Sequence, residues 1–261
     1  MPRSRPRIGV VVGLLAVVAT AVVVGYAQQG TRVPVAVDAA AAESAPAPLS
    51  VAADARVLVF GDSWTYGSAA APLDRGYAYV LAELTGWNTI VDGVRGSGYL
   101  RAGIDGPDYG SRIAALDPAL EPEVIVVQGS INDRLLVPEG YRTAVTSAWD
   151  ALAARYPTAS IVVLGPAPHV LPIDDGTVFI DTELAALAAE RDWWYISPLQ
   201  ESWITAANYL SVIDTGAGRN HPSTEGHAYL ADRLAQALGE RTVVTDAVGD
   251  SEPGDPGDPR G

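Results

Sequence analysis

The chain has 261 residues and a formal net charge of −14, and all 17 of its basic residues are arginine. Phosphate backbones are bound by clustered basic residues, so this deficit argues against a nucleic-acid partner. The sequence contains no cysteine, which excludes disulfides, thiolate nucleophiles and cysteine-ligated zinc. With 48% hydrophobic residues, we expect one core of the size of a catalytic domain.

The N-terminal segment combines a basic start with an apolar run. Arginines within the first seven residues precede an uncharged stretch over residues 8–27. Basic residues ahead of such a stretch orient it with its N-terminus in the cytoplasm, so we expect the rest of the chain to be extracytoplasmic. The stretch is long enough to span a bilayer, and Gly25 and Ala27 are small residues of the kind that signal peptidase reads. Residues 1–27 are therefore predicted to be a signal peptide or an N-terminal membrane anchor that tethers the protein to the membrane through residues 8–27.

Two compositionally biased segments flank a domain expected over residues 56–241. Residues 28–55 are rich in alanine and proline and have neither helical nor strand periodicity, which predicts a linker. Residues 242–261 are acidic and contain a short Gly-Asp-Pro repeat. Such a tail has little apolar surface to bury and is expected to be disordered.

Between these segments, short apolar runs alternate with helical patterns. Strands are predicted at residues 56–60, 89–91, 124–127, 161–164 and 194–196, and helices at 77–85, 139–156, 182–191 and 223–238. Continuous apolar strands separated by helices indicate an α/β fold, with a doubly wound, flavodoxin-like parallel sheet of about five strands and helices on both faces. In such sheets ligands bind beyond the carboxyl ends of the strands.

Residues of chemical interest follow the predicted strands. Ser63 comes after the first strand, the glycine-rich turn around Gly96 after the second and Asn132 after the third, and His221 lies in the loop before the last helix. A hydroxyl, backbone amides, a carboxamide and an imidazole are the groups that acyl transfer requires: a nucleophile, oxyanion donors and a general base.

Each of these residues also has a structural interpretation. Ser63 could cap a helix, Gly96 could provide a positive φ for a turn, Asn132 could close a turn, and His221 could be an ordinary loop histidine. Their joint placement at successive strand ends, in a chain with only three histidines, favours catalysis.

The two other histidines and the nearby aromatic residues are less informative. A metal site at His221 and His227 is disfavoured because Pro222 interrupts the helical spacing of zinc motifs, so no metal or cofactor is expected. His227 is expected to pack or cap within the last helix. His169, after the fourth strand, either lines a substrate pocket or is a plain loop residue. The same two interpretations, substrate contact or packing, apply to Trp64, Tyr66 and Tyr99.

Four segments of the chain resemble a known family. Gly61-Asp62-Ser63, Gly96, Gly129-Ser130-Ile131-Asn132-Asp133 and His221-Pro222 are similar, in order and rough spacing, to the four sequence blocks of the SGNH (GDSL) esterase/lipase hydrolases. The resemblance covers residues 56–241. It implies that Ser63 is the nucleophile and His221 the base. It also implies an oxyanion hole formed by the amides of Ser63 and Gly96 with the side chain of Asn132.

One position departs from the family pattern. The family usually has an acid three residues before the histidine, and here that position is Gly218. Losing the orienting acid costs roughly 10⁴-fold in other serine enzymes, so we expect either that another group orients His221 or that the enzyme is slow. The candidates are a backbone carbonyl of the glycine-rich loop, which we favour, and the carboxylate of Asp214.

The resemblance and the N-terminal segment together predict an exported hydrolase that cleaves carboxylic esters through an acyl-Ser63 intermediate. The expected partner is a small-molecule or cell-envelope ester, without metal or cofactor. Three alternatives remain open: an acyltransferase or a glycan O-deacetylase that uses the same residues, and a non-catalytic envelope-binding module on the same fold.

Overall fold

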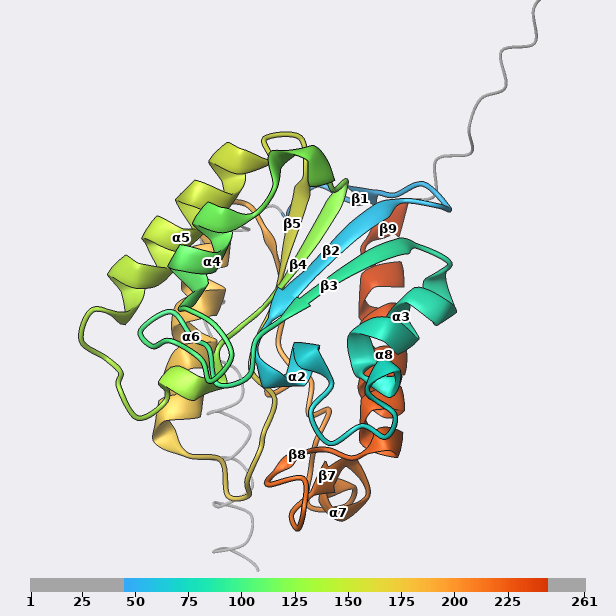
Figure 1. Ribbon diagram of the computed structural model, residues 1–261, viewed down its shortest axis with the longest axis vertical. Coiled ribbons are helices and arrows are strands. Elements are labelled where there is room, and N and C mark those ends of the chain that lie inside the picture. Colours follow the sequence, from blue (N-terminus) through green and yellow to red (C-terminus); the bar gives the residue numbers. More distant parts are fainter. Residues whose placement is uncertain (1–44, 244–261) are drawn as a thin grey trace, which may run out of the picture. The chain divides into compact units, whose positions relative to one another are not determined.

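A five-stranded parallel sheet forms the centre of the protein (Figure 1). The computed structural model describes residues 45–243. In spatial order the strands are β3 (Asn88–Gly93), β2 (Arg56–Gly61), β4 (Val124–Gln128), β5 (Ser160–Leu164) and β6 (Trp194–Ile196). This order and the helices around the sheet confirm the predicted doubly wound, flavodoxin-like α/β fold.

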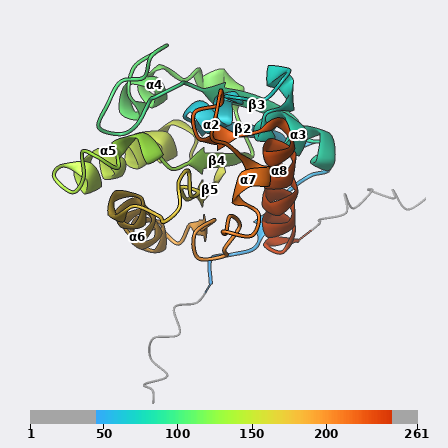
Figure 2. The same ribbon diagram turned by 90° about the horizontal axis from the view of Figure 1, so that it is seen from below.

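Helices cover both faces of the sheet (Figure 2). One face carries α3 (Tyr77–Thr85) and α8 (Thr224–Gly239), and the other carries α4 (Tyr109–Ala115), α5 (Tyr141–Arg155) and α6 (Asp175–Ala189). Successive side chains of a strand point to opposite faces, so each strand supplies two cores. In β2, Val57 and Val59 pack with the first helix group, whereas Leu58 and Phe60 pack with the second. The continuous apolar runs of the sequence thus reflect burial on both faces.

Two helices differ clearly from the prediction, whereas the remaining helix boundaries agree to within two residues. Helix α6 begins at Asp175 rather than at residue 182, because the Asp174 carboxylate caps it by accepting a hydrogen bond from the amide of Thr177 at 2.9 Å. Helix α4 was not predicted. It is short, and Asp108 caps it by accepting a hydrogen bond from the amide of Ser111 at 2.8 Å.

Several short elements lie near the carboxyl ends of the strands. They are α2 (Ser63–Tyr66), the 3₁₀ turns Leu73–Arg75 and Ile131–Asp133, α7 (Tyr209–Val212), and the strands β7 (Ile213–Asp214) and β8 (His221–Pro222). A further 3₁₀ turn, Pro118–Leu120, precedes β4. Strands β7 and β8 form an antiparallel hairpin in which Asp214 pairs with His221. Strand β2 lies between β3 and β4, where the strand order reverses, which is the position at which doubly wound sheets bind ligands.

The packed domain extends beyond the predicted limits of residues 56 and 241. Strand β1 (Leu49–Ser50) pairs in parallel with β9 (Thr242–Val243). Leu49 and Val51 are buried in the core, and the indole of Trp194 donates a hydrogen bond to the carbonyl of Ala47. The end of the predicted linker is therefore part of the domain, because its apolar side chains cover the edge of the core.

The predicted signal or anchor segment 1–27, residues 28–44 of the linker and residues 244–261 of the tail lie outside the described residues. Within residues 45–243, no helix is both long enough and apolar enough to cross a membrane.

Candidate active site

Ser63 is the first residue of the short helix α2, directly after β2. The carboxylate of Asp62 caps this helix by accepting a hydrogen bond from the amide of Trp64 at 2.9 Å. Capping was the structural interpretation of Ser63, and the neighbouring Asp62 occupies the cap position instead. The hydroxyl of Ser63 contacts His221.

The imidazole of His221 lies between the Ser63 hydroxyl and a backbone carbonyl. His221 Nε2 is 2.8 Å from Ser63 Oγ, and His221 Nδ1 is 2.7 Å from the carbonyl oxygen of Gly218. A carbonyl can only accept a hydrogen bond, so Nδ1 carries the proton and Nε2 is left free to accept the Ser63 hydroxyl proton. This tautomer is the one that a general base needs.

The β7–β8 hairpin holds His221 in this position. Its loop is closed by a hydrogen bond from the amide of Asn220 to the carbonyl of Asp214 at 2.8 Å. Arg219 and Asn220 have φ values of 51° and 63°, in the left-handed region that most residues other than glycine avoid. This turn directs the Gly218 carbonyl toward the imidazole, as we favoured from the sequence.

The carboxylate of Asp214 is engaged elsewhere. It accepts a hydrogen bond from the amide of Gly216 at 2.8 Å, and it packs against the α-carbon of Gly218. A Cβ atom at position 218 would lie 2.6 Å from Asp214 Cβ, well inside contact distance. Asp214 thus fills the space that a side chain at position 218 would need, which is a physical reason for glycine at the position of the usual acid.

Gly96 lies in the loop that follows β3 and has a φ of 75°, so this position favours glycine. The buried carboxylate of Asp133 holds this loop in place. It accepts hydrogen bonds from the amides of Tyr99 at 2.7 Å and Leu100 at 3.1 Å. The hydroxyl of Ser130 donates to the same carboxylate at 2.7 Å. The sequence motif that contains Asn132 therefore also positions the Gly96 loop, a role that sequence reasoning did not assign to Asp133.

Two contacts hold the side-chain amide of Asn132. Its Nδ2 atom donates to the carbonyl of Ser97 at 3.0 Å and approaches Asp62 Oδ2 at 3.3 Å. These contacts hold the amide in the wall of a cleft that Ser63 also lines. The longer contact, to Asp62, is the weaker of the two and is the one that a negatively charged oxygen could replace.

These groups border one cleft of about 690 Å³. Ser63, Gly96, Asn132 and His221, the residues singled out from the sequence, all line it, together with Tyr66, Ser68, Ala69, Leu73, Arg95, Arg101, Ile104, Ala217, Gly218 and Arg219. Segments far apart in the chain thus meet at the carboxyl edge of the sheet, which is where ligands are expected to bind in a doubly wound α/β fold.

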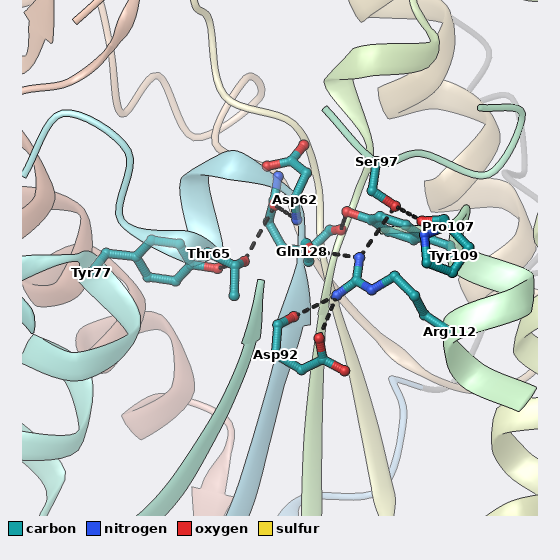
Figure 3. Close-up of polar contacts among 10 residues, drawn as sticks. Asp62, Thr65, Tyr77, Asp92, Ser97, Pro107, Tyr109, Arg112 and Gln128 are labelled. Carbon is teal, nitrogen blue, oxygen red and sulfur yellow. Dashed lines mark hydrogen bonds and ion pairs between the residues drawn. The ribbon is translucent and has the colours of Figure 1, made fainter. Parts of the chain in front are cut away.

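Arg112 is a buried cation beneath this edge that sequence reasoning missed (Figure 3). Its guanidinium donates to the carbonyl of Gly61 at 2.8 Å, and to the carbonyl and carboxylate of Asp92 at 2.8 and 2.7 Å. It also stacks on the ring of Phe60, 4.1 Å from the centroid. Arg112 therefore joins the ends of β2 and β3. The signal that could have revealed it is the capped helical pattern that begins after Asp108.

Gln128, at the end of β4, holds the turn before Ser63. Its Oε1 atom accepts a hydrogen bond from the amide of Asp62 at 3.2 Å (Figure 3). Next to it, the hydroxyls of Thr65 and Tyr77 are hydrogen-bonded at 2.8 Å. The buried polar groups behind Ser63 are therefore paired with one another, which keeps the turn rigid.

Two buried titratable groups near the site have strongly shifted pKa values. Desolvation raises the pKa of Asp62 to about 7, although the hydrogen bond from Trp64 and the charge of Arg112 act in the opposite direction. Desolvation lowers the pKa of His227 to about 4, against the hydrogen bond that its Nε2 donates to the carbonyl of Ser68. His227 Nδ1 accepts a hydrogen bond from the amide of Tyr77 at 3.1 Å, at the start of α3. His227 is thus buried as expected from the sequence, but its ring caps the start of α3 rather than the last helix.

The other residues with open roles lie as follows. His169 is close to Asp174, 3.8 Å from its carboxylate, and is not among the residues that line the cleft, which agrees with a plain loop residue. Tyr66 lines the cleft, whereas Trp64 and Tyr99 are buried in the two cores. Within residues 45–243, no group of three or more histidine or acidic side chains is arranged to hold a metal ion.

Known proteins resemble this chain in sequence and in fold. The sequence profile of the GDSL-like lipase/acylhydrolase family matches residues 59–229. A GDSL lipase of Mycobacterium tuberculosis is 27% identical over an alignment of 197 positions, which covers 72% of this chain and 83% of that protein.

Solved structures agree at the level of the fold. An aryl esterase of M. smegmatis superposes with a TM-score of 0.54 at 19% identity, and covers 72% of this chain and 99% of its own. A carbohydrate acetylesterase family member from Sinorhizobium meliloti superposes with a TM-score of 0.52 at 18% identity, and covers 71% of this chain and 97% of its own. The match of the family profile to well over half of the chain, on a fold that these esterases share, shows that this protein belongs to the GDSL-like lipase/acylhydrolase family of ester hydrolases.

Proposed function

We propose that this protein is an exported serine esterase that cleaves carboxylic esters through an acyl-Ser63 intermediate, with His221 as general base. The observation that carries the proposal is the pair of contacts made by His221. Its Nε2 is 2.8 Å from Ser63 Oγ, while its Nδ1 donates to the Gly218 carbonyl. A serine hydroxyl is a weak nucleophile until a base takes its proton, and His221 is within hydrogen-bond distance to do so.

Acylation transfers one proton through His221. Ser63 Oγ attacks the ester carbonyl carbon while its proton moves to His221 Nε2, giving a tetrahedral intermediate with a negatively charged oxygen. Collapse of this intermediate re-forms the carbonyl and breaks the bond to the leaving alcohol, which takes the proton from Nε2. The acyl group remains on Ser63.

Deacylation repeats these steps with water. His221 Nε2 takes a proton from a water molecule as its oxygen attacks the acyl carbon. When the second tetrahedral intermediate collapses, Ser63 Oγ leaves and regains the proton, and the carboxylic acid is released. An acyltransferase would differ only in the acceptor, an alcohol in place of water.

The amides of Ser63 and Gly96 and the side chain of Asn132 are the proposed donors to the oxyanion. They border the same cleft, and contacts with Ser97 and Asp62 hold Asn132 in place. Donors fixed before the reaction need no reorganisation as charge develops on the oxygen. We assign orientation of the imidazolium to the Gly218 carbonyl.

The proposal of export rests on the sequence of residues 1–27. The class of ester that the protein cleaves is a separate question. The fold is shared with aryl esterases and carbohydrate acetylesterases, so aryl, lipid-like and acetylated glycan esters are the classes to compare. An ester panel of increasing acyl length, run with and without glycan acceptors, separates esterase, O-deacetylase and acyltransferase activity.

Labelling by a fluorophosphonate tests whether Ser63 is activated. We expect the wild type to be labelled and Ser63→Ala not to be. We also expect His221→Gln to be labelled at least 10²-fold more slowly, because the base is lost. His169→Gln is the matched control, since His169 lies outside the cleft, and it should be labelled at the wild-type rate.

Two results would contradict the proposal. Labelling of His221→Gln as fast as the wild type would remove His221 from the role of base. A wild-type sample that is folded by circular dichroism and is not labelled would favour the non-catalytic envelope-binding module.

A further inference from the structure

The cleft beside Ser63 contains a concentration of arginine that the proposed reaction does not use. Arg95, Arg101 and Arg219 all line it. Arg95 is neutralised, because its guanidinium makes two hydrogen bonds to Asp105 at 2.6 and 2.9 Å. The other two cations have no such partner.

Arg101 and Arg219 are exposed, and neither guanidinium has an ion pair or hydrogen bond with any of the described residues. Burial raises the pKa of Asp133, and the charge of Arg101 opposes this rise without a direct contact, because Ser130 and the amides of Tyr99 and Leu100 already occupy that carboxylate. Every other arginine between residues 45 and 243 contacts a carboxylate or a carbonyl: Arg56, Arg75, Arg95, Arg112, Arg134, Arg142, Arg155, Arg191, Arg233 and Arg241.

Unpaired arginines are unexpected in this protein. The chain has 31 acidic residues against 17 arginines, so carboxylates are in excess. Long-range repulsion by the net charge of −14 disfavours anionic ligands. Salt screens this repulsion beyond about 8 Å at physiological ionic strength, so the cations at the cleft determine the field that a bound ligand feels.

The two arginines lie on the two loops that carry the proposed catalytic groups. Arg219 follows Gly218 in the hairpin of His221 and has a left-handed φ of 51°. Arg101 belongs to the loop of Gly96, where its carbonyl accepts a hydrogen bond from the amide of Gly98 at 3.0 Å. Strained backbone conformations of residues other than glycine concentrate at ligand-binding positions, which agrees with a binding role for Arg219.

We infer that the ester cleaved at Ser63 carries an anionic group, a carboxylate or a phosphate, which Arg101 and Arg219 bind. This inference rests on the proposed esterase function and specifies its substrate class. The guanidinium group suits both anions, because its donors match two oxygens at once. Ile104 and Leu73, which are 80% and 47% exposed, also line the cleft and offer apolar contact to the rest of the substrate.

Two 4-nitrophenyl esters of similar chain length test the inference, the neutral hexanoate and the mono-anionic hydrogen adipate. The measured quantity is the ratio of kcat/KM for the adipate to that for the hexanoate. We expect Arg101→Gln and Arg219→Gln each to lower this ratio about tenfold, since each removes a charge-assisted contact. Arg219→Lys, which keeps the charge and loses the paired donors, should restore part of it. Arg75→Gln, in which the lost partner is Glu83 outside the cleft, is the control and should leave the ratio unchanged.

Salt and competing anions complete the test. In the wild type the ratio of kcat/KM values should fall as the NaCl concentration is raised. This dependence should be weaker in the double variant Arg101→Gln/Arg219→Gln. Protection of Ser63 from fluorophosphonate by inorganic phosphate or by glutarate, in the wild type and not in the double variant, distinguishes a phosphate from a carboxylate ligand.

The inference and the proposed function fail differently. If Ser63 is labelled, but both arginine variants keep the wild-type ratio and neither anion protects, the anionic substrate class is wrong and the esterase remains. If the wild type is neither labelled nor active on either ester, the proposed function itself is wrong.

Discussion

Replacing Gly218 with alanine and Asp214 with asparagine tests which group orients His221. The Gly218 carbonyl is 2.7 Å from His221 Nδ1, whereas the Asp214 carboxylate bonds the amide of Gly216. If the carbonyl is the orienting group, Gly218→Ala should slow the enzyme and Asp214→Asn should not. If the carboxylate acts, the order reverses.

The size of the alanine effect follows from the space at position 218. An added Cβ would lie 2.6 Å from Asp214 Cβ and 2.8 Å from its carboxylate, compared with ordinary contacts of 3.4 Å or more. Relieving this overlap requires a movement of somewhat under 1 Å, which is enough to break a 2.7 Å hydrogen bond to His221. Misplacing a catalytic group by about 1 Å costs on the order of 10²-fold, so kcat should fall by roughly that factor.

Asp214→Asn preserves the loop while it removes the charge. The asparagine oxygen can still accept the hydrogen bond from Gly216, so kcat/KM should remain within about tenfold of wild type. An enzyme that depends on an orienting carboxylate would lose about 10⁴-fold.

The assay is kcat and KM on 4-nitrophenyl hexanoate, with folding checked by thermal melting. The double variant Asp214→Gly/Gly218→Ala removes the overlap and should recover most of the activity that Gly218→Ala loses. A loss near 10⁴-fold in Asp214→Asn, or full activity in Gly218→Ala, would refute the assignment of the carbonyl.

Two further predictions concern the oxyanion hole and the buried charges. Asn132→Ala should lower kcat by about 10²- to 10³-fold with little change in KM, measured on the same ester, because the donor acts on the transition state; an unchanged kcat would sink the assignment. The second prediction concerns stability between pH 4 and 6.5, where native Asp62 holds a proton that the unfolded state releases and native His227 stays neutral while the unfolded state is protonated. Raising the pH therefore lowers the contribution of Asp62 to the free energy of unfolding and raises the contribution of His227. Each changes by at most about 1.4 kcal/mol per pH unit, so the two effects oppose each other. In urea titrations, the free energy of unfolding relative to wild type should rise with pH in Asp62→Asn and fall with pH in His227→Gln; parallel curves would show that these groups keep ordinary pKa values.

Most of the sheet could be predicted because burial on both faces leaves a direct mark on the sequence. Runs such as Val124–Gln128 have no polar alternation to confuse with an exposed strand. The elements that were missed or misplaced depend on caps and tertiary packing. Helix α4 is too short to show a clear helical period. Strand β1 forms because Leu49 and Val51 pack into the core and because β9 lies beside it to pair with it.

The placement of the candidate site could be predicted for a similar reason. Parallel strands bring their carboxyl ends to one edge, so Ser63, Gly96 and Asn132 had to come close once the fold was assigned. The supporting residues could not be predicted in this way. Arg112 and Asp133 act through hydrogen bonds to backbone groups, and such partners depend on loop conformations that no spacing in the sequence specifies.

Gly218 illustrates the limit most clearly. From the sequence it is an acid missing at an expected position, whereas in the structure its carbonyl occupies the hydrogen-bonding position at His221 Nδ1 and its lack of a side chain makes room for Asp214. The hairpin register that pairs Asp214 with His221 produces both effects, because it turns the intervening loop back on itself. An acid introduced at position 218 would collide with Asp214 before it reached the imidazole. The departure from the family pattern is therefore a property of two positions together, and single substitutions that restore the usual acid should reduce activity rather than raise it.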